Sequence, residues 1–309
     1  MKKIKIIGYG TYLPKNKVIF NDQVRYHSAG ENQIDMAVEA CNSALNQGNL
    51  KMEDIDLILS ASAVSAQPIP ATAVLIHERI AKGLNIPAFD VNSSCTSFIT
   101  ALEIASNYIE LNQYKNILIV ASDISSIGLN EEQKESFELF SDGAAAIIIT
   151  KSNEENVGVV ASLQKTFSEG AHSTEIRGGG SLMPSYQYDI SKKADYLFDM
   201  KGREILLTTA RSLPLVFEEF FEKNNIDLDD INLIIPHQAS KALEMVMNRL
   251  NIPKEKYIDW VQEYGNMVSV SVPFVLCKLL EEKKIKNGDR LLLCGTAAGL
   301  TINMLLLNI

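Results

Sequence analysis

The two halves of this chain carry the same pattern of sequence, and this repetition restricts the folds that the chain can adopt. Residues 53–59 (EDIDLIL) resemble residues 229–235 (DDINLII). Each copy follows a predicted helix and opens a predicted buried strand, and the order of the surrounding elements repeats as well. Such a duplication predicts an α/β protein of two βαβ-type halves, each with a mixed sheet between helices.

Hydrophobic periodicity places the elements of these halves, which we expect at residues 1–155 and 156–309. Apolar runs predict strands and three-to-four spacing predicts helices. The predicted strands are 4–8, 55–61, 86–91, 116–122, 144–150, 157–163, 231–235, 290–295 and 301–307. The predicted helices are 34–45, 71–81, 96–112, 201–223, 240–250 and 268–282. Residues 168–198 are aperiodic and rich in Gly, Ser and Tyr, which indicates a long loop near the functional site or at an interface.

The composition argues against several classes of function. A net charge of −9 disfavours nucleic-acid binding, which needs a basic face. The chain has no run of about 18 apolar residues, so we expect no membrane span. The N-terminal apolar run is too short for a signal peptide. The cysteines form no CxxC pair and the histidines no HxxxH or HxH pattern, so we expect neither a disulfide framework nor a metal site. These features favour the reducing cytoplasm.

Cys95 stands between a predicted strand and a predicted helix. The strand ends near Val91, and small polar residues lead to the apolar helix. We expect Ser93 and Ser94 to cap this helix and Cys95 to lie in its first turn. Free amides and the helix dipole would stabilise a thiolate there. For a cysteine considered alone, a buried and inert side chain is the more frequent case.

Three further segments carry polar or small residues near predicted strand ends or helix starts. His237 follows the strand 231–235, Asn266 precedes the helix 268–282, and the small-residue loop 294–299 follows another strand. The carboxyl ends of strands are where open α/β sheets bind ligands. Considered singly, each segment has a structural explanation: a strand-end histidine, a helix cap and a tight hairpin turn.

Together, the four sites supply the groups that acyl-thioester chemistry requires. A thiolate at Cys95 accepts an acyl group, while His237 and Asn266 both have hydrogen-bond donors for a developing enolate. The backbone amides of Cys95 and Ala298 would form an oxyanion hole. The joint occurrence of these groups is much less frequent by chance than any one of them.

With these residues the chain resembles the β-ketoacyl-acyl-carrier-protein synthase III group of thiolase-fold condensing enzymes over almost its whole length. The segments that carry the resemblance are, in chain order, residues 8–14 (GYGTYLP), 87–95 (PAFDVNSSC), 141–145 (SDGAA), 236–239 (PHQA) and 264–266 (YGN). The resemblance implies a thiolase-like five-layered αβαβα fold and a homodimer.

The resemblance also implies a mechanism. Cys95 takes an acyl group from acyl-coenzyme A or an acyl carrier protein, and a malonyl thioester then binds and loses CO₂. His237 and Asn266 stabilise the enolate oxygen, the carbanion attacks the acyl-cysteine, and no metal or organic cofactor takes part. Ile69 is implied in the acyl-pocket wall of the other subunit, and Thr296, Ala298 and Gly299 belong to the loop beside the enolate.

The sequence departs from the family where the thioester carriers bind. The segment that usually holds coenzyme A with a tryptophan and arginines is shortened at residues 21–28, and the only tryptophan is Trp260. Leu207 and Ala242 occupy positions that are usually basic, and residues 295–299 replace a glycine triplet. We therefore expect a divergent, secondary-metabolism-like member whose carrier-docking patch is weakened or moved.

Two alternatives stay open at this point. An acyltransferase on the same fold would pass the acyl group from Cys95 to an oxygen, nitrogen or carbon acceptor without decarboxylation, although Asn266 argues mildly against it. A non-catalytic partner subunit would normally lose the nucleophile, and this chain has kept it. A Cys/His/Asn protease is remote because of the duplicated core.

Overall fold

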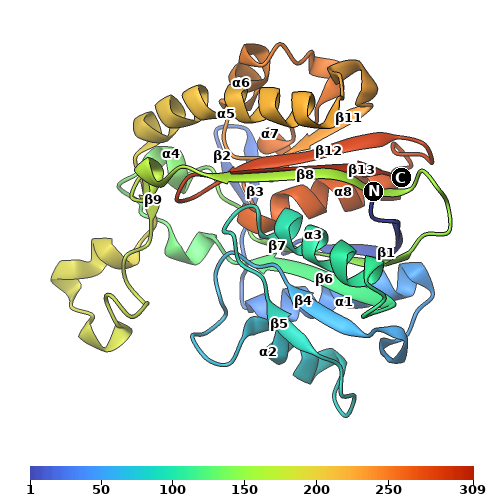
Figure 1. Ribbon diagram of the computed structural model, residues 1–309. Coiled ribbons are helices and arrows are strands. Elements are labelled where there is room, and N and C mark those ends of the chain that lie inside the picture. Colours follow the sequence, from blue (N-terminus) through green and yellow to red (C-terminus); the bar gives the residue numbers. More distant parts are fainter.

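The computed structural model describes residues 1–309, which form two β-sheets separated and covered by helices (Figure 1). The first sheet has the strand order β1-β7-β6-β4-β5, and the second, in the same sense, has the order β8-β13-β12-β11. Equivalent neighbours run in equivalent directions: β6 and β7 pair antiparallel, as β12 and β13 do, whereas β4 and β6 pair parallel, as β11 and β12 do. The two sheets are thus copies of one α/β arrangement.

The first sheet contains β1 (Ile4–Tyr12), β4 (Leu57–Ser60), β5 (Ala88–Asp90), β6 (Asn116–Asp123) and β7 (Gly143–Lys151). The second contains β8 (Gly158–Thr166), β11 (Leu233–Pro236), β12 (Arg290–Ala297) and β13 (Thr301–Asn308). Two small pairs are β2 (Lys17–Phe20) with β3 (Gln23–Tyr26), and β9 (Thr174–Glu175) with β10 (Asp199–Met200). The helices are α1 (Gln33–Gly48), α2 (Thr72–Ile80), α3 (Ser97–Glu110), α4 (Lys134–Phe137), α5 (Gly202–Asn224), α6 (Leu243–Arg249), α7 (Val261–Tyr264) and α8 (Ser271–Glu281).

The layers follow the order αβαβα, as the resemblance implies. Helices α1 and α2 cover the outer face of the first sheet, α3 and α8 lie between the sheets, and α5 and α6 cover the outer face of the second (Figure 1). Buried apolar side chains form three clusters: the largest, of 32 residues, lies between the two sheets, and the other two lie between each sheet and the helices on its outer face. The middle layer joins the two halves into one body.

The inner strands of both sheets are buried on both faces because alternate residues enter different clusters. In β7, Ala145 and Ile147 join the cluster between the sheets, whereas Ala146 and Ile148 face α1. This explains why the inner strands are continuous apolar runs without polar alternation. A shift by one residue would exchange the two sets of side chains, so the register is strongly specified.

The sequence predicts the long elements well and two segments less well. The predicted helix 268–282 is a 3₁₀ turn, Val268–Val270, followed by α8. The predicted loop 168–198 contains short 3₁₀ helices and β9, and it projects from the body of the molecule (Figure 1). The boundary at residues 155 and 156 falls between β7 and β8 and stays a prediction. None of the helices combines the length and the hydrophobicity that crossing a bilayer requires.

Candidate active site

Cys95 lies in the loop between β5 and α3, where side-chain hydrogen bonds hold a tight turn. Ser94 has a φ of +53°, in the left-handed region, and its N–H donates to Oδ1 of Asn92 at 2.8 Å. The Thr96 N–H donates to the Ser93 carbonyl at 3.3 Å. Short polar side chains tolerate or support such a turn better than apolar ones do. The small polar residues before Cys95 therefore serve the shape of this loop.

The prediction that this loop caps the helix and favours a thiolate is wrong. Helix α3 begins at Ser97 with Thr96 in the N-cap position, and no side chain caps it. Cys95 therefore precedes the helix. The backbone amides of Ala298 and of Cys95 itself donate toward the sulfur, but burial raises the pKa of the thiol to about 12, and the negative charge of Asp123 acts in the same direction. Burial outweighs the two amides, so the resting side chain is a neutral thiol.

His237 lies at the C-terminal end of β11, as predicted. Its backbone N–H donates to the Cys294 carbonyl at 2.7 Å, which extends the parallel pairing of β11 with β12. The residue is 3% exposed, and its Nδ1 has no hydrogen-bond partner in the protein. Burial lowers the pKa of the imidazole to about 4, so the ring is neutral near pH 7. A neutral ring supplies one N–H donor and one acceptor.

Gly295 allows the loop of Cys95 to lie against His237. A Cβ atom on Gly295 would lie 2.8 Å from the Cβ of His237 and 3.3 Å from Cγ2 of Thr96. The residue after Cys95 and the predicted enolate-binding histidine thus flank the same point of β12. Only glycine leaves this space free. The fold therefore brings Cys95 of the first half next to His237 of the second.

Asn266 is tied to the histidine segment by its own side chain. Its Nδ2 donates to the carbonyl of Ala239 at 3.1 Å, and the Ala239 N–H donates to the carbonyl of His237 at 2.8 Å. Its Oδ1 accepts from the Val268 N–H at 2.8 Å, and its backbone pairs with residues 139–141. Asn266 is 4% exposed. The sequence offered Asn266 as a helix cap, and its Oδ1 accepts from the turn that precedes the helix. One of its two Nδ2 hydrogens is left for a ligand.

The remaining predicted residues divide into two groups. Ala298 lies in the turn between β12 and β13, where its backbone amide lowers the pKa of the Cys95 thiol. Thr296 and Gly299 lie on the same hairpin and are half-buried. Ile69 is 84% exposed on the segment between β4 and α2, so a single chain leaves it outside its own buried site.

Two buried charged residues support the site and were not predicted. Asp123 ends β6, is 2% exposed, and accepts hydrogen bonds from the backbone and the hydroxyl of Ser269. Arg25 is fully buried, and a Cβ on Gly265, next to Asn266, would lie 2.6 Å from its Cδ. Asp123 left a signal in the sequence, because it is a carboxylate that directly continues an apolar strand. Arg25 left none, since two of its partners are the backbone carbonyls of Glu138 and Gln262 in distant segments.

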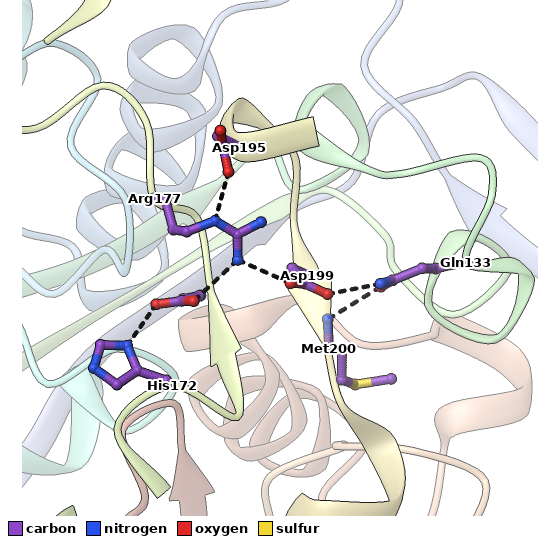
Figure 2. Close-up of polar contacts among 7 residues, drawn as sticks. Gln133, His172, Arg177, Asp195, Asp199 and Met200 are labelled. Atoms are coloured by element: carbon purple, nitrogen blue, oxygen red, sulfur yellow. Dashed lines mark hydrogen bonds and ion pairs between the residues drawn. The ribbon is translucent and has the colours of Figure 1, made fainter. Parts of the chain in front are cut away.

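The projecting segment is fastened at its base by Arg177 (Figure 2). The guanidinium donates to Asp195 at 2.7 Å, Asp199 at 2.9 Å and Glu175 at 3.0 Å, and these hydrogen bonds raise the pKa of Arg177 above its ordinary value. Gln133 in turn donates to Asp199 and links the cluster to the body. Large apolar side chains are exposed on the segment, namely Ile176, Leu182, Tyr186, Tyr188 and Ile190.

Comparison with known proteins shows the family of the chain. The sequence-family model of 3-oxoacyl-[acyl-carrier-protein (ACP)] synthase III matches residues 89–167, and the family model of its C terminal region matches residues 221–309. The chain is 36% identical to a β-ketoacyl-[acyl-carrier-protein] synthase III of Clostridium perfringens, over 97% of this chain and 98% of that protein. This chain belongs to the β-ketoacyl-acyl-carrier-protein synthase III family. The matched regions include Cys95 in the first and His237 and Asn266 in the second.

Other members of the synthase III family show the same extent of similarity. The Aquifex aeolicus enzyme is 32% identical over 98% of both chains. The crystal structure of 3-oxoacyl-[acyl-carrier-protein] synthase III from Aquifex aeolicus superimposes with a TM-score of 0.88 at 30% identity, covering 99% of this chain and 100% of that chain. The protein is therefore a condensing enzyme of the synthase III type, an acyltransferase with the thiolase-like fold.

Proposed function

We propose that this synthase condenses an acyl thioester with a malonyl thioester, and that Cys95, His237 and Asn266 are its catalytic residues. The observation that carries the proposal is their common position: the loop of Cys95 packs against His237 at Gly295, and Asn266 is bonded to the residues that follow His237. These side chains come from both halves of the chain; His237 and Asn266 are buried, and Cys95 is half-buried. A shared, water-poor site of this kind suits the formation of a carbanion.

In the first half-reaction, the sulfur of Cys95 attacks the thioester carbonyl. A new carbon–sulfur bond forms, the bond to the carrier breaks, and the carrier leaves as its thiol with the proton that Cys95 gives up. The amides of Cys95 and Ala298 already point toward the sulfur, so they are placed to stabilise the negative oxygen of the tetrahedral intermediate. Loss of one oxyanion-hole donor costs about 10²–10³-fold in rate in a serine protease that uses the same device.

In the second half-reaction, the malonyl thioester places its thioester oxygen at His237 and Asn266. The neutral imidazole and the free Nδ2 hydrogen of Asn266 donate to this oxygen as CO₂ leaves and the enolate forms. The enolate carbon attacks the acyl carbon on Cys95, forming the carbon–carbon bond and breaking the carbon–sulfur bond. The thiolate of Cys95 then takes a proton from water, which its high pKa favours.

The substrates, assembly and location belong to the same proposal. The relatives named above carry the acyl carrier protein in their names, and we propose an acyl carrier protein or coenzyme A thioester as the substrate of this enzyme. We further propose a cytoplasmic homodimer. Support for it comes from Ile69, 84% exposed, and from the apolar side chains of the projecting segment, which a second copy would cover.

The test is mass spectrometry of the protein after exposure to a panel of acyl-coenzyme A and acyl-carrier thioesters. We expect one acyl group on the peptide that contains Cys95, lost in Cys95→Ala and kept in Cys41→Ala, because Cys41 is a buried core cysteine. The absence of an adduct with every thioester would refute the proposal.

The acyltransferase alternative is tested by the second half-reaction. Leu207 and Ala242, which replace basic residues, and the altered loop 295–299 motivate it. Carboxyl-labelled malonyl thioester is added to the acylated enzyme, and released CO₂ is counted. Release that depends on Asn266 supports condensation, whereas transfer of the acyl group without release would establish the alternative.

A further inference from the structure

We propose that Asp123 and Ser269 form a clamp that sets the position of Asn266 relative to Cys95, so that both are positioning residues for the condensation step. The inference rests on the proposed function, because it assigns a role to residues next to the proposed catalytic groups. Neither residue touches the reacting atoms in this proposal. Each acts through the backbone segments that it connects.

Asp123 joins three segments at the centre of the molecule. It ends β6, and its carboxylate accepts from the Oγ of Ser269 at 2.5 Å and from the Ser269 N–H at 3.2 Å. It also accepts from the N–H groups of Ala63 at 3.1 Å and Val64 at 3.2 Å. Hydrogen bonds to a carboxylate are shorter and stronger than those between neutral groups. The carboxylate therefore holds a segment of the first half against a segment of the second.

One side of the clamp leads to Cys95. The carbonyl of Ala63, whose N–H binds Asp123, accepts from Nδ2 of Asn92 at 2.8 Å. Asn92 in turn accepts the N–H of Ser94 at 2.8 Å through its Oδ1. Ser94 directly precedes Cys95 and has the positive φ of the loop. A continuous chain of hydrogen bonds thus runs from Asp123 to the turn that presents the sulfur.

The other side of the clamp leads to Asn266. Ser269 lies in the 3₁₀ turn Val268–Val270, whose first N–H donates to Oδ1 of Asn266 at 2.8 Å. Val268 has a φ of +52°, a conformation that is strained for a β-branched residue. Such strain persists only where the surroundings hold the backbone firmly. The two hydrogen bonds from Ser269 to Asp123 hold the backbone at the residue that directly follows Val268.

The charge of Asp123 argues that the contact is more than packing. The carboxylate is 2% exposed, and burial raises its pKa to about 6 while only hydrogen bonds from neutral groups lower it. A buried carboxylate without a cation is costly, and an apolar residue would fill the space at lower cost. The same charge lies close enough to Cys95 to raise the pKa of its thiol. The position of the carboxylate is therefore tied to the site.

Ser269→Ala tests the clamp, because it removes the 2.5 Å bond and leaves the backbone intact. Acylation of Cys95 and release of CO₂ from malonyl thioester are measured separately. We expect condensation to fall at least tenfold while acylation stays within twofold of the wild type, since Asn266 serves only the second step. Ser106→Ala is the matched control: Ser106 is equally buried, but it donates within its own helix to Glu103, so both rates should stay unchanged.

Asp123→Asn is the second variant, with a readout that a merely structural residue would not alter. Removing the charge should lower the pKa of the Cys95 thiol, so its alkylation by iodoacetamide at pH 8 should accelerate severalfold while condensation slows. Equal loss of acylation and condensation in Ser269→Ala, or unchanged alkylation in Asp123→Asn, would overturn the clamp. Failure of the wild type to become acylated would instead refute the proposed function.

Discussion

Gly295→Ala is the substitution that most directly tests how the two halves build the site. Gly295 lies on β12 between the loop of Cys95 and the side chain of His237. Its added methyl group would lie 2.8 Å from the Cβ of His237 and 3.3 Å from Cγ2 of Thr96. The first contact is with an atom bonded directly to the backbone, so no rotation of a side chain relieves it.

The expected magnitude follows from these distances. Carbon atoms in contact lie at least about 3.5 Å apart, so His237 or β12 must move by roughly 0.7 Å. Overpacking of a dense core costs about 1–3 kcal/mol of stability. A displacement near 1 Å at a catalytic group costs on the order of 10²-fold in rate. We therefore expect condensation to slow by about 10–100-fold in a protein that still folds.

The assay compares condensation rates of folded variants at a temperature well below their melting points. Gly288→Ala is the control, because Gly288 has a φ of +93° but open space around it, at a turn before β12. It should lose about 1–2 kcal/mol of stability from backbone strain and keep its activity. Thr96→Ser in the Gly295→Ala background removes only the 3.3 Å contact and should restore little. Wild-type condensation in Gly295→Ala would refute the proposed packing of His237 against the loop of Cys95.

Three further predictions concern charge. The pKa of His237 is about 4 in the folded protein and about 6.5 in the unfolded chain, so the unfolded state binds a proton at the higher pH. The free energy of unfolding therefore falls as the pH is lowered from 6.5 to 4. Urea denaturation should show that the wild type loses about 3 kcal/mol more than His237→Gln between pH 6.5 and pH 4; equal losses would contradict the neutral, buried ring. Because the pKa of Cys95 is about 12, its alkylation rate should rise about tenfold per pH unit from pH 7 to pH 9 without a plateau, as followed by mass spectrometry. Arg177→Met should accelerate tryptic cleavage at Lys192 or Lys193 several-fold and change the melting temperature little, since the lost ion pairs are partly exposed; unchanged cleavage would show that Arg177 does not fasten the segment.

The fold was predictable because its signal is repeated along the chain. Each buried strand is an apolar run. Because such a strand is buried on both faces, polar residues do not alternate with apolar ones along it, and the run is easy to recognise. The start of α3 was placed too early because the amphipathic pattern continues through Thr96, which is buried while it forms the turn before the helix. The break between Val268–Val270 and α8 was missed for a similar reason: all of these residues have an apolar or small side chain, and periodicity does not report a positive φ.

The candidate site was predictable in its residue types and less so in its electrostatics. Cys95, His237 and Asn266 stand beside turn-forming residues at element ends, which the sequence displays. The charge state of Cys95 depends instead on burial and on Asp123, which is distant in sequence. Local reasoning about helix amides therefore predicted a thiolate where the folded protein favours a thiol. Arg25 was missed because its partners in distant segments are backbone carbonyls, which any sequence would supply.

The shifts of Cys95 and His237 have one cause, and it bears on the proposed chemistry. Burial raises the pKa of the thiol and lowers that of the imidazole, so the site favours the neutral form of each group. The same poor solvation would destabilise the carboxylate of a bound malonyl group, and loss of CO₂ removes that localised charge. The negative charge then passes to an oxygen held by His237 and Asn266, so donors fixed in a dry site replace water at the step where charge forms. A site built to stabilise a resting thiolate would need polar surroundings, and these would favour the intact malonyl carboxylate as well.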